Sequence, residues 1–150
     1  MHSANSVKRV AGVVAVAAAA FGIAVAGGSS AAAAPAPDAP QVTVSPSTNL
    51  SEGTPITVTV SGFKAAQKVH FSECAEIGGA NVCDHDGSGQ ITTDGNGGGS
   101  SASVAHKTFV GYLDNGTKWG TVDCKTAEHG CYVGAGADDG TGATTVISFS

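Results

Sequence analysis

Apolar β-branched residues alternate with hydroxyl residues in several stretches, and this period of two constrains the fold more than any other feature of the sequence. Ile56, Val58 and Val60 alternate with Thr57 and Thr59. Residues two positions apart lie on the same face of a strand, so this stretch predicts a strand that buries its aliphatic side. The same alternation recurs in three further stretches, 42–45, 68–72 and 146–149.

Turn signals separate these predicted strands, and no window shows the apolar stripe of a helix. The chain contains 22 glycines, which disfavour helices. Asn115-Gly116 is the best hairpin signal, because this dipeptide tolerates the positive φ angles of a type I′ turn. Short strands with frequent turns predict an all-β sandwich or barrel.

The N-terminal segment has the pattern of a secretory signal peptide. Lys8 and Arg9 precede an apolar run at 10–26, and alanines follow up to Ala33. A membrane anchor is the alternative, since 17 apolar residues reach the lower limit for a span, but no charged stop-transfer cluster follows. We therefore predict a signal peptide at 1–33 and a single domain at 34–150, which places the protein outside the cell and off the membrane after cleavage.

The charge balance of the predicted mature domain disfavours one class of partner. Without residues 1–33 the chain keeps 5 lysines, no arginine and 12 acidic residues, a formal charge of −7. Binding to the phosphate backbone of nucleic acids requires basic side chains. The sequence thus predicts no direct nucleic-acid binding by the polypeptide.

The four cysteines are an even number in a chain expected to be exported, so a disulfide framework is predicted. Four cysteines allow three pairings, and the economical choice is two local loops, Cys74–Cys83 and Cys124–Cys131. A structural metal site is the alternative for paired cysteines. Metal-binding pairs usually have two to four residues between them, and these spacings are longer.

Other patterns of site chemistry are weak. Asp84, Asp86 and Ser88 match the first positions of a calcium loop, but its twelfth position is Gly95 and a polar turn is the preferred interpretation. The histidines show no zinc-ligand spacing, and His70 and His106 are expected to face solvent. The serine closest to a nucleophile motif lies in a glycine-rich loop without a strand-to-helix elbow. We therefore predict neither a metal site nor an enzyme.

The segment 108–124 brings several aromatic residues close to a cysteine. Phe109, Tyr112, Leu113 and Trp119 surround the predicted hairpin. Aromatic and apolar surface with a few fixed polar groups is typical of small-molecule sites. Phe109 and Trp119 are expected in the core, and Tyr112 is the strongest ligand-binding candidate of the segment.

The same segment carries a resemblance to a known family. GTKWGTVDC at 116–124 resembles the neocarzinostatin family, the apoproteins of enediyne chromoprotein antibiotics. The resemblance extends to VTVSPSTNLSEGT at 42–54, the two cysteine pairs and the ending ISFS at 147–150. It implies a seven-stranded immunoglobulin-like β-sandwich with two short β-ribbons flanking a cleft. It further implies a secreted, monomeric carrier that protects a non-covalently bound enediyne chromophore, requires no other cofactor, and damages DNA only through the released ligand.

The resemblance also implies a set of ligand-binding residues. The Cys74–Cys83 disulfide corresponds to the floor of the cleft. The ribbon tip corresponds to Tyr112 and Leu113, and the far wall to three successive residues, Gly134, Ala135 and Gly136.

This chain departs from the family pattern at two aromatic positions of the cleft. Glu76 stands where neocarzinostatin has a tryptophan, and a glycine-rich stretch at 86–89 replaces a phenylalanine. Glu76 is expected at the mouth of the cleft, facing solvent or a cationic group of the ligand. The alternative function is a secreted immunoglobulin-like interaction module that keeps the fold without an enediyne cargo.

Overall fold

The computed structural model describes residues 38–150, so the predicted signal peptide at 1–33 lies outside the described residues. These residues form ten strands and contain no helix that could cross a membrane. The strands are β1 (Gln41–Ser45), β2 (Thr54–Ser61), β3 (Lys68–Ile77), β4 (Ala80–Asp84), β5 (Gly89–Thr92), β6 (Gly99–Ala105), β7 (Thr108–Tyr112), β8 (Lys118–Asp123), β9 (Cys131–Ala137) and β10 (Gly142–Ile147).

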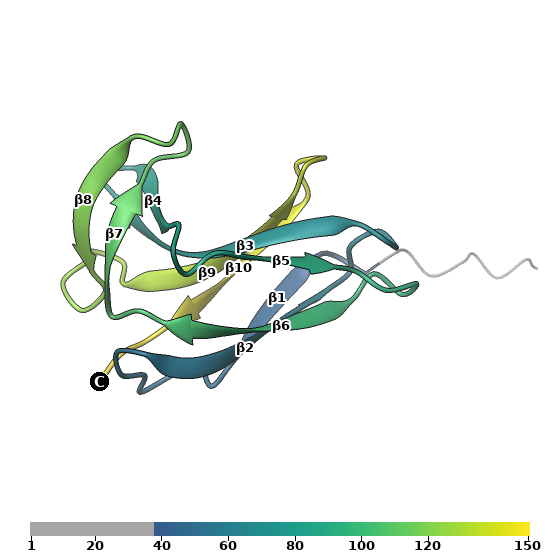
Figure 1. Ribbon diagram of the computed structural model, residues 1–150, viewed down its shortest axis with the longest axis horizontal. Coiled ribbons are helices and arrows are strands. Elements are labelled where there is room, and N and C mark those ends of the chain that lie inside the picture. The colour runs from purple at the N-terminus through teal and green to yellow at the C-terminus, as the bar shows by residue number, and fades with distance from the viewer. Residues whose placement is uncertain (1–37) are drawn as a thin grey trace, which may run out of the picture. The chain divides into compact units, whose positions relative to one another are not determined.

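The strands form two sheets, which confirms the predicted all-β architecture. One sheet has the order β1-β2-β6, and the other has the order β10-β9-β3-β4-β7-β8, with β5 paired to β3. The first sheet and the group β10-β9-β3-β5 form the two layers of a seven-stranded sandwich. The pairs β3–β4 and β7–β8 form two ribbons at one end of the sandwich (Figure 1), and the pairing of β4 with β7 joins them.

The core lies between the two layers and follows the predicted alternation. On β2, Ile56, Val58 and Val60 are buried while the threonines between them are exposed. On β3, Val69 and Phe71 point into the same core. Period two therefore places every second side chain of each central strand between the sheets.

Both predicted disulfides are present. Cys74 and Cys83 are direct partners across β3 and β4, and Cys124 and Cys131 join the end of β8 to the start of β9. The first disulfide ties together the ribbon beside the sandwich, and the second is buried in the core.

The β7–β8 hairpin is confirmed, but its turn type differs from the prediction. The N–H of Gly116 donates to the carbonyl of Leu113 at 2.8 Å, and the N–H of Leu113 donates to the carbonyl of Thr117 at 2.9 Å. Gly116 has a φ of 80°, whereas Asn115 does not have a positive φ. This is the three-residue loop that ends in a glycine bulge, in place of the two-residue type I′ turn.

The expected core position of Trp119 was wrong. Phe109 is buried as predicted, but Trp119 is 48% exposed. The pairing of β7 with β8 shifts by one residue here, because Lys118 pairs with Tyr112 and Gly120 pairs with Gly111. Trp119 occupies the unpaired position on an edge strand, where the sandwich does not cover it.

Candidate ligand-binding site

A cleft of about 750 Å³ lies on the outer face of the β3–β9–β10 sheet. Its floor consists of rows of paired residues from neighbouring strands. Ser72 pairs with Gly134, and Cys74 pairs with Tyr132. His70, two positions before Ser72, extends the same face, and Thr144 of β10 lies opposite Gly134. The floor is thus formed by the side chains of these strands that point away from the core.

One wall of the cleft comes from β4 and the turn after it. Asn81 and Cys83 of β4 line the cleft, as do His85, Ser88 and Gly89. A Cβ atom at Gly89 would lie 2.4 Å from the ring of Phe71. Glycine at this position therefore lets β5 pass close to the phenyl ring, which itself borders the cleft.

The predicted site residues divide into those that line this cleft and those that do not. Cys74, Cys83, Gly134 and Ala135 line it. Glu76 lines a smaller cleft of about 360 Å³, together with His129 and Val146. Three further predicted residues, Tyr112, Leu113 and Gly136, line neither cleft.

Tyr112 lies directly behind the wall of the cleft. Its ring stacks on the imidazole of His85, with the ring centroids 4.3 Å apart and the planes 10° from parallel. Leu113 packs against the hydrophobic core, and the next residue, Asp114, borders the cleft. The β7–β8 ribbon therefore meets the cleft at two points: Tyr112 supports the ring of His85, and Asp114 borders the cleft itself.

Tyr132 separates the two clefts and lines both of them. Its hydroxyl donates a hydrogen bond of 2.8 Å to Oδ1 of Asn81, which joins β9 to β4 across the boundary. Burial, assisted by the nearby carboxylates of Glu76 and Asp114, raises the pKa of the Tyr132 phenol. The phenol therefore stays neutral and keeps its proton for the bond to Asn81.

The lining of the large cleft includes no lysine or arginine among the described residues, and Asp114 is its one acidic side chain. Apolar atoms, two imidazoles and a few hydroxyl and amide groups make up the rest. Such a surface suits an uncharged, largely apolar molecule with a few hydrogen-bonding groups.

Four ring-bearing residues of this cleft were not among the predicted site residues: His70, Phe71, His85 and Tyr132. A signal for two of them was available. His70 lies four residues before Cys74, and Tyr132 lies two before Gly134, so period two places them on the face of a predicted site residue. Phe71 has the parity of a core residue, and His85 lies in a turn, where no such periodicity applies.

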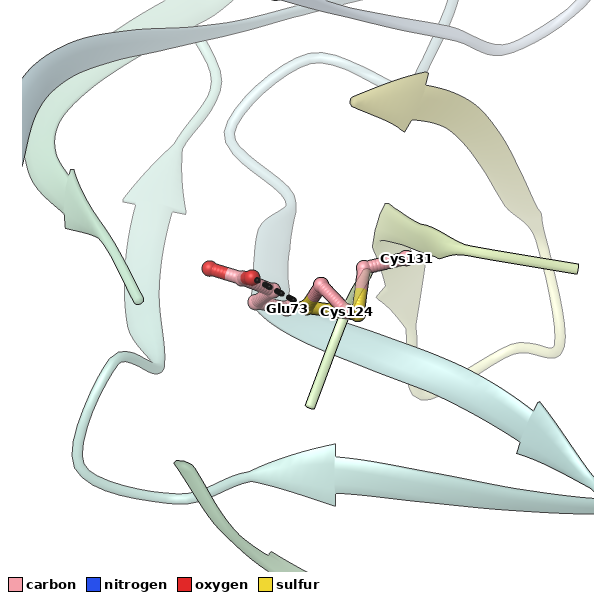
Figure 2. A group of neighbouring side chains, drawn as sticks. All are labelled: Glu73, Cys124 and Cys131. Atoms are coloured by element: carbon pink, nitrogen blue, oxygen red, sulfur yellow. Dashed lines mark hydrogen bonds between the residues drawn. A yellow bond between two sulfur atoms is a disulfide. The ribbon is translucent and has the colours of Figure 1, made fainter. Parts of the chain in front are cut away.

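A buried carboxylate lies behind the cleft, on the inward face of β3. Glu73 is only 4% exposed, and its Oε1 lies 3.3 Å from Sγ of Cys124. Figure 2 shows its carboxylate beside the Cys124–Cys131 disulfide. Glu73, Cys124 and Cys131 have the geometry of a metal-binding group, with their ligand atoms within 4.8 Å of one another. Both sulfurs are joined in a disulfide, however, so neither offers the thiolate that a metal requires.

Glu73 and its neighbour His106 titrate abnormally. Burial raises the pKa of the Glu73 carboxyl to about 7, although the N–H of His106 donates to its Oε2 at 3.0 Å and opposes this rise. The hydrogen bond between Nδ1 of His106 and Oδ2 of Asp84, 2.5 Å long, raises the pKa of the imidazole. His106 is half-buried in this pair, which differs from the exposed position expected from the sequence.

Comparisons with known proteins agree with the resemblance noted in the sequence. Residues 42–149 match the sequence model of the Neocarzinostatin family. The antitumor antibiotic C-1027 apoprotein of Streptomyces globisporus is 39% identical over 98 residues, which are 65% of this chain and 67% of that protein. Macromomycin of Streptomyces macromomyceticus is 38% identical over 114 residues, 75% of this chain and 78% of that protein.

The solved structures that are similar to this one include those of two relatives. That of macromomycin has a TM-score of 0.69 at 37% identity, and that of apokedarcidin has a TM-score of 0.63 at 32% identity. Each covers 75% of this chain and the whole of the other chain. The sequence of apokedarcidin from an actinomycete is 35% identical, over 72% of this chain and 96% of that protein.

Proposed function

The chain belongs to the neocarzinostatin family, and on this premise we propose that it is an exported carrier that binds and shields a small apolar ligand in its large cleft. The volume of the cleft is the observation that carries the proposal. At about 750 Å³ it lies within the range of roughly 300–1,000 Å³ that is typical of small-molecule sites. The relatives include an antitumor antibiotic apoprotein, so the proposed cargo is an enediyne-type chromophore held without a covalent bond.

The proposed ligand contacts follow from the geometry of the cleft. The disulfide Cys74–Cys83, Gly134 and Ala135 contact the ligand directly, and Tyr112 acts by supporting the ring of His85. Glu76 in the smaller cleft contacts only a substituent that extends past Tyr132.

The proposed role is physical rather than catalytic. A ligand buried in the cleft is withdrawn from water and thiols, and the protein makes or breaks no bond in it. The acidic charge of the mature domain supports the further proposal that the ligand-free, monomeric protein does not bind nucleic acid.

The test fills the cleft with a side chain. Gly134 has an ordinary backbone conformation, and a Cβ atom there would lie 3.5 Å or more from its neighbours, so Gly134→Leu projects into the cleft without distorting the strand. We expect the affinity for a neutral naphthalene carboxamide, measured by calorimetric titration, to fall at least about tenfold, or about 1.4 kcal/mol. Trp119 fluorescence is not a suitable readout, because that residue lies outside the cleft.

The matched control is Gly95→Leu, which adds the same side chain to open space in the β5–β6 turn and leaves binding unchanged. Equal affinities of the two variants would refute the assignment of the cleft. If the unmodified protein bound no probe at about 1 mM, the interaction-module alternative would replace the carrier. A parallel titration with duplex DNA at physiological salt is expected to show no binding.

A further inference from the structure

Asp84 connects the core of the sandwich to the wall of the cleft. Its side chain is buried, and Oδ1 accepts a 2.9 Å hydrogen bond from the N–H of Asp86 in the turn after β4. Its backbone carbonyl accepts a 2.6 Å bond from the hydroxyl of Ser72 on the cleft floor. The other carboxylate oxygen, Oδ2, holds Nδ1 of His106.

The turn after β4 packs closely against the pair formed by Asp84 and His106. A Cβ atom at Gly87 would lie 2.6 Å from Oδ2 of Asp84 and 3.2 Å from Nδ1 of His106. The hydroxyl of Ser88 closes the turn with a 2.6 Å bond to the carbonyl of His85. His85, Ser88 and Gly89 line the cleft, so any displacement of Asp84 or His106 moves its wall. We call residues 85–89 the wall turn.

Glu73 holds the other side of His106. Its carboxyl accepts a hydrogen bond from the backbone N–H of His106, while Asp84 forms a hydrogen bond with the imidazole of the same residue. The titratable groups that act on Glu73 are His106 from the β6–β7 connection, Asp84 from β4 and Glu52 from the β1–β2 connection. Glu73 also contacts the Cys124–Cys131 disulfide, which joins the end of β8 to the start of β9 and does not titrate. No lysine of the described chain is among these groups, so His106 is the one cation of the cluster.

The charge of this cluster changes around neutral pH. Below neutral pH, Glu73 is protonated and His106 is charged, so that its charge cancels that of Asp84. At alkaline pH Glu73 ionises and His106 loses its proton, which leaves two buried carboxylates without a cation. Unpaired charges in a buried site are strongly unfavourable, and the contacts that hold the wall turn are the ones that separate them.

We propose that Glu73, Asp84 and His106 position the wall turn, and that ligand retention is therefore stronger at mildly acidic pH than at alkaline pH. The inference rests on the carrier function proposed above. Ligand in the cleft favours the wall position that the neutral cluster supports, so ligand binding and protonation of Glu73 reinforce each other.

The experiment compares the unmodified protein with Glu73→Gln, whose side chain has nearly the same shape and stays neutral. We expect affinity for the naphthalene carboxamide to fall about threefold or more between pH 6 and pH 8.5 in the unmodified protein. This corresponds to a Glu73 pKa about half a pH unit higher with ligand bound than without it. Glu73→Gln is expected to lose most of this dependence. Glu128→Gln, an exposed carboxylate outside the cluster, keeps it.

Two imidazoles, His70 and His85, line the cleft, and both variants retain them. The result that decides is therefore the difference between the two pH profiles. Identical profiles for Glu73→Gln and the unmodified protein would overturn the proposal, as would a flat profile for the unmodified protein. Should Glu73→Gln fail to fold, Glu73→Met supplies an uncharged side chain of similar volume.

A second readout separates this inference from the carrier function. Amide protection factors of Asp86–Gly89 in the ligand-free protein are expected to fall from pH 6 to pH 8.5, and to fall much less in Glu73→Gln. If no probe binds at any pH, the carrier function is refuted, and the protection factors alone decide whether the cluster positions the wall turn. Unchanged protection factors would then also refute the proposal that the cluster positions the wall turn.

Discussion

Strands β2 and β3 each bury one face in the same core, but the side chains on these two faces differ in polarity. On β2 the inward positions are Ile56, Val58 and Val60, all aliphatic. On β3 they begin with Val69 and Phe71 and continue with the carboxyl of Glu73. The β3 segment that carries Glu73 is also the segment whose outer face forms the floor of the cleft.

This comparison separates two kinds of stability within one sandwich. Burial of aliphatic side chains does not depend on proton concentration, whereas burial of a carboxyl group favours its protonated form. The β2 region is therefore expected to contribute equally at every pH, and the cleft end to respond to pH.

The largest expected effect is the pH dependence of the whole domain. The pKa of the Glu73 carboxyl is about 7 in the folded protein and has its ordinary value of 4.5 in the unfolded chain. Between these two pH values the folded state therefore binds more protons than the unfolded state. This difference contributes about 3 kcal/mol to the free energy of unfolding. The contribution is complete below pH 4.5 and is lost as the pH rises through 7. The raised pKa of His106 acts in the same direction above pH 6.5.

Urea denaturation at pH 5 and pH 8 measures this effect. The unmodified protein should be less stable at pH 8, and Glu73→Gln should show a much smaller difference. Asp94 and Asp139 do not interfere, because hydrogen bonds lower the pKa of both carboxyls and their contributions change only at more acidic pH. Equal stability of the unmodified protein at both pH values would remove the distinction between the two regions.

The second effect is the loss of aliphatic burial on β2. Val58 is fully buried, so Val58→Ala is expected to lower the free energy of unfolding by about 1–3 kcal/mol. The loss should be the same at pH 5 and pH 8, since no titratable group is involved. Thr59→Ala, on the exposed face of the strand, serves as the control and should change stability by less than about 0.5 kcal/mol. A loss for Val58→Ala that varied with pH would show that the two regions are coupled.

The smallest effect concerns the boundary between the two clefts. Tyr132→Phe removes the hydrogen bond to Asn81 and is expected to cost about 0.5–1.5 kcal/mol in the same denaturation experiment. The cost should be equal at pH 5 and pH 8, because the raised pKa keeps the phenol neutral throughout. A cost that appeared only at one pH would place Tyr132 within the pH-sensitive region and shift the boundary of the comparison.

The sequence predicted the fold well because the signals for it are local. Alternation around Val58 identified the strand and its buried face, and Asn115-Gly116 identified a hairpin. Local spacing of the cysteines was sufficient for both disulfides. The turn type and the exposure of Trp119 were not predicted, since both depend on the one-residue shift between β7 and β8.

The lining of the candidate site could be predicted only where it repeats a family pattern or a strand period. Cys74 and Gly134 lie on one face of neighbouring strands, and the sequence brought both into the proposed cleft. Glu76 lies on the same face as Cys74 but reaches the smaller cleft, because Tyr132 and Asn81 close the boundary between them.

By itself, the sequence determined which side chains share a strand face, because that depends only on a period of two. It also determined the cysteine pairs and the family. Only the tertiary structure decided what covers each face. Glu73 has the parity of a core residue, but it lies beside the Cys124–Cys131 disulfide and His106 because β9 and the β6–β7 connection pack onto β3. The surroundings that raise the pKa of this carboxyl are up to 51 residues away in the chain, so no local pattern can report them.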